Sequence, residues 1–267
     1  MISSMGARVG SWLLRPRSGP LRGLLLGGLL ATLPLGGCGG GGAGDPRGGD
    51  YLLDPSKAHY GASFARWSQR WWQWAYELPA TNHPLLDPVG TNAAVGQTDP
   101  VWFLGSEFCS LYEPCDGVAT REITIPAGKA LFFPLVNVSW TNQECVEPDT
   151  TLTYTELRKL SADTVEGATD IFLSIDGDVV VDSPTFLGAQ IYRAQTEEFS
   201  YHVPADSLFL QICNDTVVDV DHDPCAGDGL YVMISPLPVG THTIRFGGAF
   251  PSLGFTTDAQ STIHVLP

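Results

Sequence analysis

Basic residues are scarce in this 267-residue sequence: 14 Lys and Arg stand against 29 Asp and Glu, and the formal net charge is −15 at pH 7. A surface this acidic repels phosphate groups, which argues against nucleic acid and anionic lipid as partners. The charge suits a secreted protein or one that attracts cations. Solubility alone explains it equally well.

Motifs of the common hydrolytic and nucleotide-dependent enzymes are also missing. The sequence contains no Gly-x-Ser-x-Gly, no His-Glu-x-x-His and no phosphate-binding loop. Its cysteines and histidines do not form the repeated close pairs that a structural zinc site needs. We see no internal repeat either. These absences favour a non-catalytic protein, although they do not decide the question.

A long unbroken apolar run is missing too, which argues against a transmembrane anchor. The run at 24–35 is short, contains glycines, follows four arginines and leads into Leu-Gly-Gly-Cys at 35–38. This order is typical of a secretory signal peptide. The last four residues resemble a bacterial lipobox, in which the cysteine is lipidated and becomes the first mature residue. We therefore predict a signal peptide at 1–37, a lipid on Cys38 and a flexible Gly-rich tether at 38–50. The alternative is an ordinary signal peptide with Cys38 incidental.

Processing at Cys38 removes four of the 14 basic residues, so ten face 29 acidic ones and the mature net charge becomes −19. Export and lipidation predict a protein anchored to the cell envelope. Gly39, rather than Asp, after the cysteine resembles an outer-membrane address if the source is Gram-negative. Composition does not change along 51–267. We therefore expect a single domain there, long enough to bury a substantial core.

The stretch 63–78 holds four of the seven tryptophans. On a helix, its large apolar residues fall on one face, with the offsets of an amphipathic helix: Phe64, Trp67, Trp71, Trp74, Ala75 and Leu78. Ser63 is a suitable N-cap and Pro79 a stop. A helix with so much aromatic area on one side must pack on a large surface. We expect that surface to be a β-rich body, with Trp67, Trp71 and Trp74 buried.

The sequence after residue 100 is mainly β in pattern. Short apolar or alternating segments, separated by Pro, Gly or Asp, occur at 101–104, 122–125, 130–138, 171–175, 179–181, 199–203, 208–213, 231–234, 242–246 and 261–265. Asp176-Gly177 predicts a hairpin, and Pro134 predicts a bulge or an edge position. Thr153 and Glu156 form a capping-box pattern that predicts an inserted helix near 153–166. We predict a mainly β fold with helical decoration, an antiparallel β-sandwich or jelly roll packed against the N-terminal Trp-rich helix.

Several motifs together look familiar. They are Trp-x-x-x-Trp-Trp-x-Trp at 67–74, Asn-His-Pro at 82–84, Val-Gly-Gln-x-x-Pro-Val-Trp-Phe-Leu at 95–104, Ile-Pro-Ala-Gly-Lys-Ala-Leu-Phe-Phe-Pro at 125–134 and Gly-x-His-Thr-Ile-x-Phe-Gly-Gly at 240–248. This set resembles a family of uncharacterised exported bacterial proteins, from roughly residue 57 to the end. The family has no assigned activity, so the resemblance implies none. The two cysteine-bearing loops, 109–115 and 213–225, look like local elaborations outside the shared pattern.

Two groups of residues could form a site near the Trp-rich helix. Trp72 and Tyr76 lie on its flank, where exposed aromatic rings could stack on a sugar or another flat ligand; a second packing surface is the alternative. His83, Asp87 and Glu107 lie in the neighbouring loops, where a histidine and carboxylates could act as general acid and base. Capping and turn formation explain these three residues equally well.

The densest acidic cluster could hold a hard cation. Asp219, Asp221, Asp223 and Asp228 alternate in the manner of calcium ligands. Pro224 replaces the glycine of an EF-hand loop, however, and Leu230 replaces its bidentate glutamate. A calcium loop of a β-sandwich is therefore one interpretation and a solvated acidic turn is the other.

Five cysteines follow Cys38, and export permits disulfides. We predict the local pairs Cys109–Cys115 and Cys213–Cys225, which leave Cys145 as an unbridged thiol.

These observations predict a cell-envelope lipoprotein whose β-sandwich binds a small molecule, a glycan or a protein, with carbohydrate as the favoured class. The alternative is a hydrolase or lyase acting on an extracellular polymer, with a site between the Trp-rich helix, the 79–110 loop and the sheet. A structural envelope protein is the second alternative.

Overall fold

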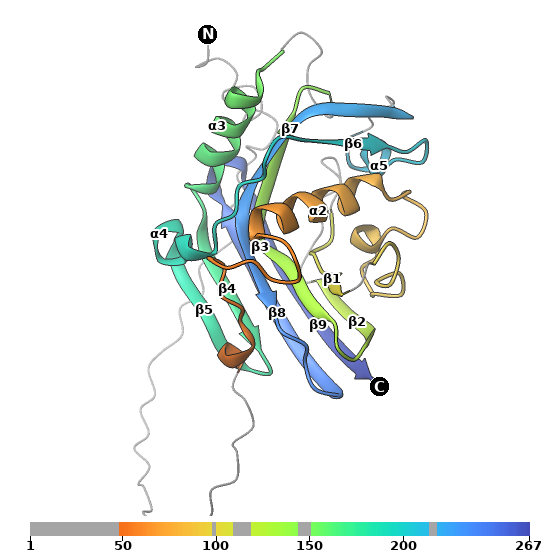
Figure 1. Ribbon diagram of the computed structural model, residues 1–267, viewed down its shortest axis with the longest axis vertical. Coiled ribbons are helices and arrows are strands. Elements are labelled where there is room, and N and C mark those ends of the chain that lie inside the picture. Colours follow the sequence, from red (N-terminus) through yellow and green to blue (C-terminus); the bar gives the residue numbers. More distant parts are fainter. Residues whose placement is uncertain (1–47, 98–99, 109–118, 144–150, 214–217) are drawn as a thin grey trace, which may run out of the picture. The chain divides into compact units, whose positions relative to one another are not determined.

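The computed structural model describes residues 48–97, 100–108, 119–143, 151–213 and 218–267 (Figure 1). The predicted signal peptide, Cys38, Cys109, Cys115 and Cys145 lie outside the described residues. Residues 47–267 cluster as one compact unit. The end of the predicted tether is part of this unit, because Gly48–Tyr51 form a short 3-10 helix, η2, and the Gly48 amide donates to Asp178 Oδ2 at 3.0 Å.

Two sheets form the body of the protein. The first has four strands in the order β1 (Val101–Phe103), β3 (Ala130–Thr141), β7 (Val220–Ile234) and β6 (Phe199–Val203). The second has five strands in the order β2 (Ala119–Pro126), β9 (Phe255–Leu266), β8 (Gly240–Phe250), β4 (Thr169–Ile175) and β5 (Asp178–Thr185). This arrangement confirms the predicted mainly β fold with helical decoration.

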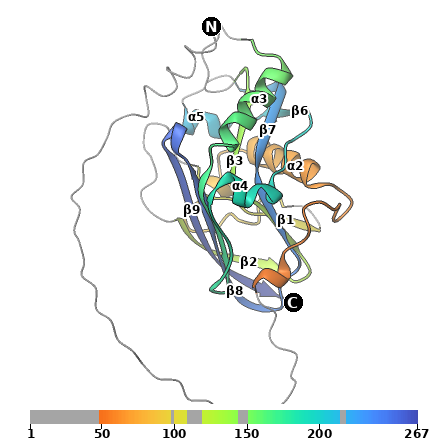
Figure 2. The ribbon, with the colours of Figure 1, turned by 90° about the vertical axis from the view of Figure 1, so that its left-hand side faces the viewer.

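Three layers follow from the alternation of side chains along β3 and β7. Phe133 of β3 and Val232 of β7 face the five-stranded sheet and join the core between the two sheets. Phe132 and Met233 point the other way and join a second core under helix α2 (Phe64–Glu77). Figure 1 and Figure 2 show α2 on the face of the four-stranded sheet that is turned away from β8 and β9. Burial on both faces explains why 130–138 is an almost continuous apolar run.

The helix and turn signals place their elements correctly. Ser63 Oγ accepts from the Arg66 amide at 3.2 Å and begins α2, whose Trp67, Trp71 and Trp74 are buried as predicted. The capping box at Thr153 begins α3 (Tyr154–Val165). Asp176 and Gly177 have φ values of 52° and 86°, the left-handed pair that a tight two-residue hairpin turn needs between β4 and β5.

Two details differ from the prediction. The pairs β1–β3 and β2–β9 are parallel, so the sheets are mixed rather than wholly antiparallel. Residues 208–212, predicted as a strand, form the helix α5 (Leu208–Ile212), because Ser207 Oγ caps it by accepting from the Phe209 amide at 3.1 Å. The register shift between Pro134 and Val136 in β3 does match the predicted bulge.

The remaining helices are short: α4 (Phe186–Ala189), η3 (Pro84–Leu86), η4 (Gln190–Tyr192) and η5 (Pro251–Leu253). Across the described ranges, the search for membrane spans finds no helix with the length and apolarity to cross a bilayer.

Candidate functional site

The predicted aromatic platform is not exposed. Only 3% of Trp72 and 7% of Tyr76 are accessible to solvent. The two rings pack on each other with centroids 5.0 Å apart, and Tyr76 continues onto Tyr201 and Phe209 at 4.7 and 4.9 Å. The interpretation of Trp72 and Tyr76 as a stacking surface is therefore wrong, and the alternative of a second packing surface holds.

The reason is that α2 is enclosed on two sides. Its main apolar face lies on β3, and its flank lies against β6 and α5, which supply Tyr201 and Phe209. Gly227 of β7 makes room for the Trp72 ring, since a Cβ there would lie 2.6 Å from Trp72 Nε1. A helical wheel describes the helix alone, so it cannot reveal this second partner.

The predicted calcium ligands do not converge. Asp219 and Asp221 flank the exposed His202, whose ring nitrogens lie 3.5 and 2.8 Å from their carboxylates. The hydrogen bond to Asp221 raises the pKa of His202. Asp223 is exposed, and 221–223 belong to strand β7 rather than to a loop. No group of three or more His, Cys, Asp or Glu side chains in the described residues could hold a metal. The calcium interpretation is wrong.

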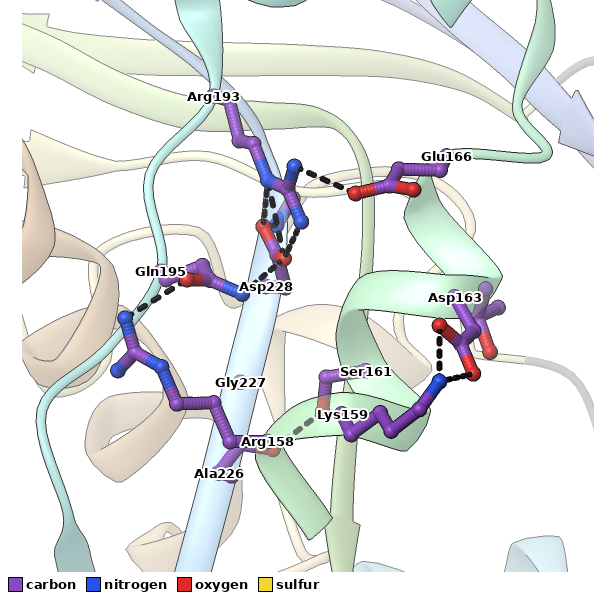
Figure 3. A network of polar contacts seen from close by, with 12 residues as sticks. Arg158, Lys159, Ser161, Asp163, Glu166, Arg193, Gln195, Ala226, Gly227 and Asp228 are labelled. Carbon is purple, nitrogen blue, oxygen red and sulfur yellow. Dashed lines mark hydrogen bonds and ion pairs between the residues drawn. The ribbon is translucent and has the colours of Figure 1, made fainter. Parts of the chain in front are cut away.

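Asp228, the fourth predicted calcium ligand, is fully buried and binds an arginine instead (Figure 3). Arg193 Nη2 donates to Asp228 Oδ2 at 2.7 Å and Arg193 Nε donates at 3.1 Å. Gln195 Nε2 and the Gly229 amide complete the carboxylate's partners, each at 2.8 Å. Arg193 also reaches Glu166 at the end of α3, 2.9 Å away. Burial lowers the pKa of Arg193, but its bonds to Asp228 and Glu166 raise it overall.

This network around Asp228 joins the 193–196 segment to β7 and α3. Arg158 extends it by donating to Gln195 Oε1 at 2.7 Å and to the Thr196 carbonyl at 2.9 Å. Ser161 Oγ bonds the Ala226 carbonyl at 3.0 Å. Because the Asp228 carboxylate is saturated by the chain's own donors, the network is a structural clamp rather than a ligand site.

One predicted disulfide is also corrected. Cys225 is not part of a disulfide: it lies buried in β7, and its Sγ donates to the His222 carbonyl at 3.4 Å. The Cys213–Cys225 pair is therefore wrong, although Cys213 itself is disulfide-bonded. The predicted Cys109–Cys115 pair and Cys145 lie outside the described residues.

The strongest candidate site surrounds Arg121, a residue for which the sequence reading proposed no role. Alternation along β2 places Arg121 on the same side as the buried Ile123 and Ile125. Only 5% of Arg121 is exposed. Its Nη1 donates to the Gly105 carbonyl at 2.8 Å, whereas its buried Nε and Nη2 find no acceptor in the part of the chain that the structure describes.

The three predicted catalytic residues do gather near this guanidinium. Burial lowers the pKa of Arg121, while the charges of Glu107 and Asp87 raise it. Burial also lowers the pKa of His83, and the nearby Arg121 adds to that effect. An arginine stays protonated in proteins even when its pKa falls. The site therefore combines one cation with two carboxylates and a neutral imidazole.

His83 and Asp87 are occupied by the backbone. His83 Nδ1 accepts from the Leu85 amide at 3.0 Å, so its proton lies on Nε2, which is 2.9 Å from the Ala75 carbonyl. Asp87 accepts three backbone amides, from residues 89, 90 and 92, at 3.0, 3.1 and 2.6 Å. These two side chains shape the 83–92 loop, as the capping interpretation predicted. His83 therefore has no ring nitrogen left for proton transfer at a substrate, and the loop fills three of the about four acceptor positions of Asp87.

The loop lies directly on β2 and forms one wall of the site. The Glu122 amide donates to the Val89 carbonyl at 2.9 Å. Gly90 has a φ of 92°, and a Cβ there would lie 2.7 Å from the Glu122 carbonyl oxygen. Only glycine combines this backbone conformation with such a close approach.

A small hollow beside β2 is lined in part by Arg121. Its lining consists of Trp74, Pro84, Gly90, Ala93, Phe103, Leu104, Gly105, Arg121 and Ile123. The empty space is about 230 Å³ when its part open to solvent is counted, but only about 10 Å³ can hold the centre of a water-sized group. The hollow therefore admits roughly one water-sized group beside the arginine.

The arrangement can bind an acceptor, and two of its three acid–base candidates, His83 and Asp87, are engaged by the backbone. An apolar lining with one buried polar donor group matches a small-molecule site in composition, but the hollow is so small that only a single oxygen-bearing group of a ligand fits inside it. The sequence did carry a signal for it, since Arg121 interrupts the inward-facing positions of an otherwise alternating strand. Comparison of the chain with protein-family models, curated proteins and solved structures finds no match.

Proposed function

We propose that this protein is an exported, lipid-anchored binding protein of the cell envelope. Its ligand presents a neutral oxygen acceptor, such as a hydroxyl or amide carbonyl of a carbohydrate, to Arg121. Lipidation at Cys38 anchors it, in the outer membrane if the source is Gram-negative. The support is the signal and lipobox pattern of the sequence, together with the chemistry of the Arg121 hollow.

The observation that carries the proposal is that two buried Arg121 nitrogens, Nε and Nη2, have no acceptor among the described residues. A buried donor left unpaired costs about 1–3 kcal/mol, and more when it is charged. A ligand oxygen in the hollow recovers that free energy. Unpaired buried donors are rare in native proteins, so these two nitrogens need an explanation, and a bound ligand oxygen would supply it.

The charges favour a neutral ligand. Asp87 and Glu107 already act on the Arg121 charge. A carboxylate or phosphate in the hollow would be repelled by the two negative charges that already act on Arg121. A hydroxyl or carbonyl oxygen accepts from Nε or Nη2 without that repulsion.

Binding is favoured over catalysis by the state of the acid–base candidates. The polar atoms of His83 and Asp87 form hydrogen bonds with backbone groups of residues 75–92. A general base must lie within hydrogen-bond reach of the proton that it removes and have a position to accept it. The predicted hydrolase or lyase would therefore need catalytic groups other than these two.

Ligand-observed NMR with two probes tests the proposal on the full-length lipidated protein in detergent micelles. N-acetylglucosamine supplies neutral hydroxyl and amide oxygens, and acetate supplies a small anion. We expect N-acetylglucosamine to bind the wild type and Arg245→Gln, a control at an exposed arginine paired with Asp258. In Arg121→Gln, we expect binding to weaken at least tenfold.

Two results would contradict this account. Equal N-acetylglucosamine binding by Arg121→Gln and Arg245→Gln would place the ligand elsewhere. Binding of acetate, but not of N-acetylglucosamine, in an Arg121-dependent manner would show that the ligand is an anion. The anchor is tested separately, because Cys38→Ser should abolish acyl labelling and release the protein from membranes.

A further inference from the structure

One end of the sandwich gathers several exposed aliphatic side chains from turns far apart in sequence. Val179 is 72% exposed, Val239 is 58% exposed and Leu266 is 52% exposed. Val179 follows the β4–β5 turn, Val239 precedes β8, and Leu266 is the last residue of β9. We call this set of turns the lower end, after its place in Figure 1.

Hydrogen bonds and strand register tie these turns together. The Asp176 amide of the β4–β5 turn donates to the Thr243 carbonyl at 2.8 Å. His242 Nε2 lies 3.0 Å from the Pro238 carbonyl, just before Val239. Gly240 pairs with Val265 across β8 and β9. The lower end is therefore the end of the five-stranded sheet at which β4 and β9 finish and β5 and β8 begin. Both ribbon views show these strand ends together (Figures 1 and 2).

The acidic side chains of the β4–β5 turn are engaged by the chain. Asp176 holds His242 Nδ1 at 2.7 Å and the Thr243 amide at 2.7 Å. Asp178 accepts from the Gly48 amide. Both carboxylates are thus engaged by donors of the chain, although they keep their negative charge. A zwitterionic lipid surface, which carries no net charge, does not repel this edge.

The position of Gly48 connects the lower end to the predicted anchor. Gly48 contacts Ile175 and Asp178, at the end of β4 and the start of β5. Residues 39–47 join Gly48 to Cys38. A chain of this length spans at most about 36 Å, at roughly 3.6 Å per residue step. The domain is about as long as this reach. Phe255 and Leu266 lie at the two ends of the twelve-residue strand β9, roughly 37 Å apart at about 3.4 Å per residue.

We propose that the lower end rests on the zwitterionic lipid surface of the membrane, with Val179, Val239 and Leu266 as the side chains in contact with lipid. This inference depends on the proposed lipid anchor at Cys38. The anchor limits the distance of Gly48 from the bilayer to the length of the tether, and burial of the three aliphatic side chains in the interface then favours this orientation. The opposite end, with Phe255, then faces away from the membrane.

Site-specific fluorescence quenching tests the orientation in the full-length lipidated protein. One cysteine is added at a time, as Val179→Cys or Val239→Cys, and carries a bimane label in phosphatidylcholine vesicles, in which some of the lipids bear a nitroxide on the headgroup. Leu187→Cys and Phe255→Cys are the controls. Leu187 is 70% exposed on α4, which matches Val179, and Phe255 marks the opposite end. Labelling of the parent protein is subtracted as background.

We expect the labels at 179 and 239 to be quenched at least threefold more than those at 187 and 255. Equal quenching at all four positions, in protein that floats with the vesicles, overturns the orientation and leaves the anchor intact. Failure of the protein to float overturns the anchor and this inference together. N-acetylglucosamine binding reports on the Arg121 hollow independently of either result.

Discussion

Replacing Trp72 by alanine is expected to destabilise the protein by several kcal/mol, as replacing Trp71 is. Trp72 is 3% exposed and Trp71 is 1% exposed, although a helical wheel places only Trp71 on the apolar face. A tryptophan side chain buries about 150–250 Å². At about 25 cal/mol/Å², this burial is worth about 4–6 kcal/mol. A compact unfolded state reduces that value, which leaves about 3–5 kcal/mol for either substitution.

Each substitution also has a cost beyond the buried area that is lost. Trp72→Ala removes the ring 5.0 Å from Tyr76 and leaves a cavity beside Gly227, whose missing side chain accommodates the indole. Trp71→Ala leaves the buried Leu104 carbonyl without its 2.7 Å donor. Such an orphaned acceptor costs about 1–3 kcal/mol. We therefore expect Trp71→Ala to be the more destabilising by up to that amount.

Urea unfolding followed by far-UV circular dichroism measures both variants without relying on tryptophan emission. Leu187→Ala, at an exposed position, is the control and should change the free energy of unfolding by less than about 0.5 kcal/mol. A loss below about 1 kcal/mol for Trp72→Ala would show that its flank is not packed. The reasoning about a helix enclosed on two sides would then be refuted.

Three other predictions concern charged groups. Asp228→Ala, which leaves Arg193 without its buried partner, should cost about 3–5 kcal/mol, whereas Asp163→Ala, in an exposed pair with Lys159, should cost at most about 1 kcal/mol in the same urea assay. The pKa of His83 is lowered below its ordinary 6.5 in the folded state, so the unfolded chain takes up the proton first and stability falls as the pH drops below 6.5. His83→Asn should flatten that part of the pH–stability curve, and an unchanged slope would rule out His83 as its source. Calcium should leave the melting temperature of the wild type unchanged, and a calcium-dependent rise that Asp221→Asn abolishes would restore the metal site.

Local signals in the sequence were sufficient where a short segment determines its own structure. Ser63 and the Thr153 capping box give the starts of two helices, and Asp176-Gly177 gives a hairpin turn, because each acts through backbone conformation or hydrogen bonds within four residues. The apolar run at 130–138 likewise reflects burial on both faces of one strand. These signals established the fold class.

Features set by distant partners were not predictable. In the sequence, nothing distinguishes Asp228 from the other acidic residues near it. Its partner Arg193 lies 35 positions earlier in the chain, and only the folded strand β7 brings the two together. Trp72 looks exposed until β6 and α5 cover it. The first part of the fifteen-residue strand β7, residues 220–230, was not predicted as a strand. Its acidic residues and glycines do not show the alternation of polar and apolar residues that marks a half-buried strand.

The Nε–H group of Arg121 offers the most direct test of a binding site in the hollow. Its ¹H–¹⁵N resonance can be followed by NMR in the full-length protein while N-acetylglucosamine is added. A ligand oxygen that accepts from this group should shift the resonance in a saturable manner and leave the Nε–H resonance of Arg245 in place. A resonance that stays unmoved, with a cross-peak to one bound water, would show that water fills the hollow and would contradict the proposed function.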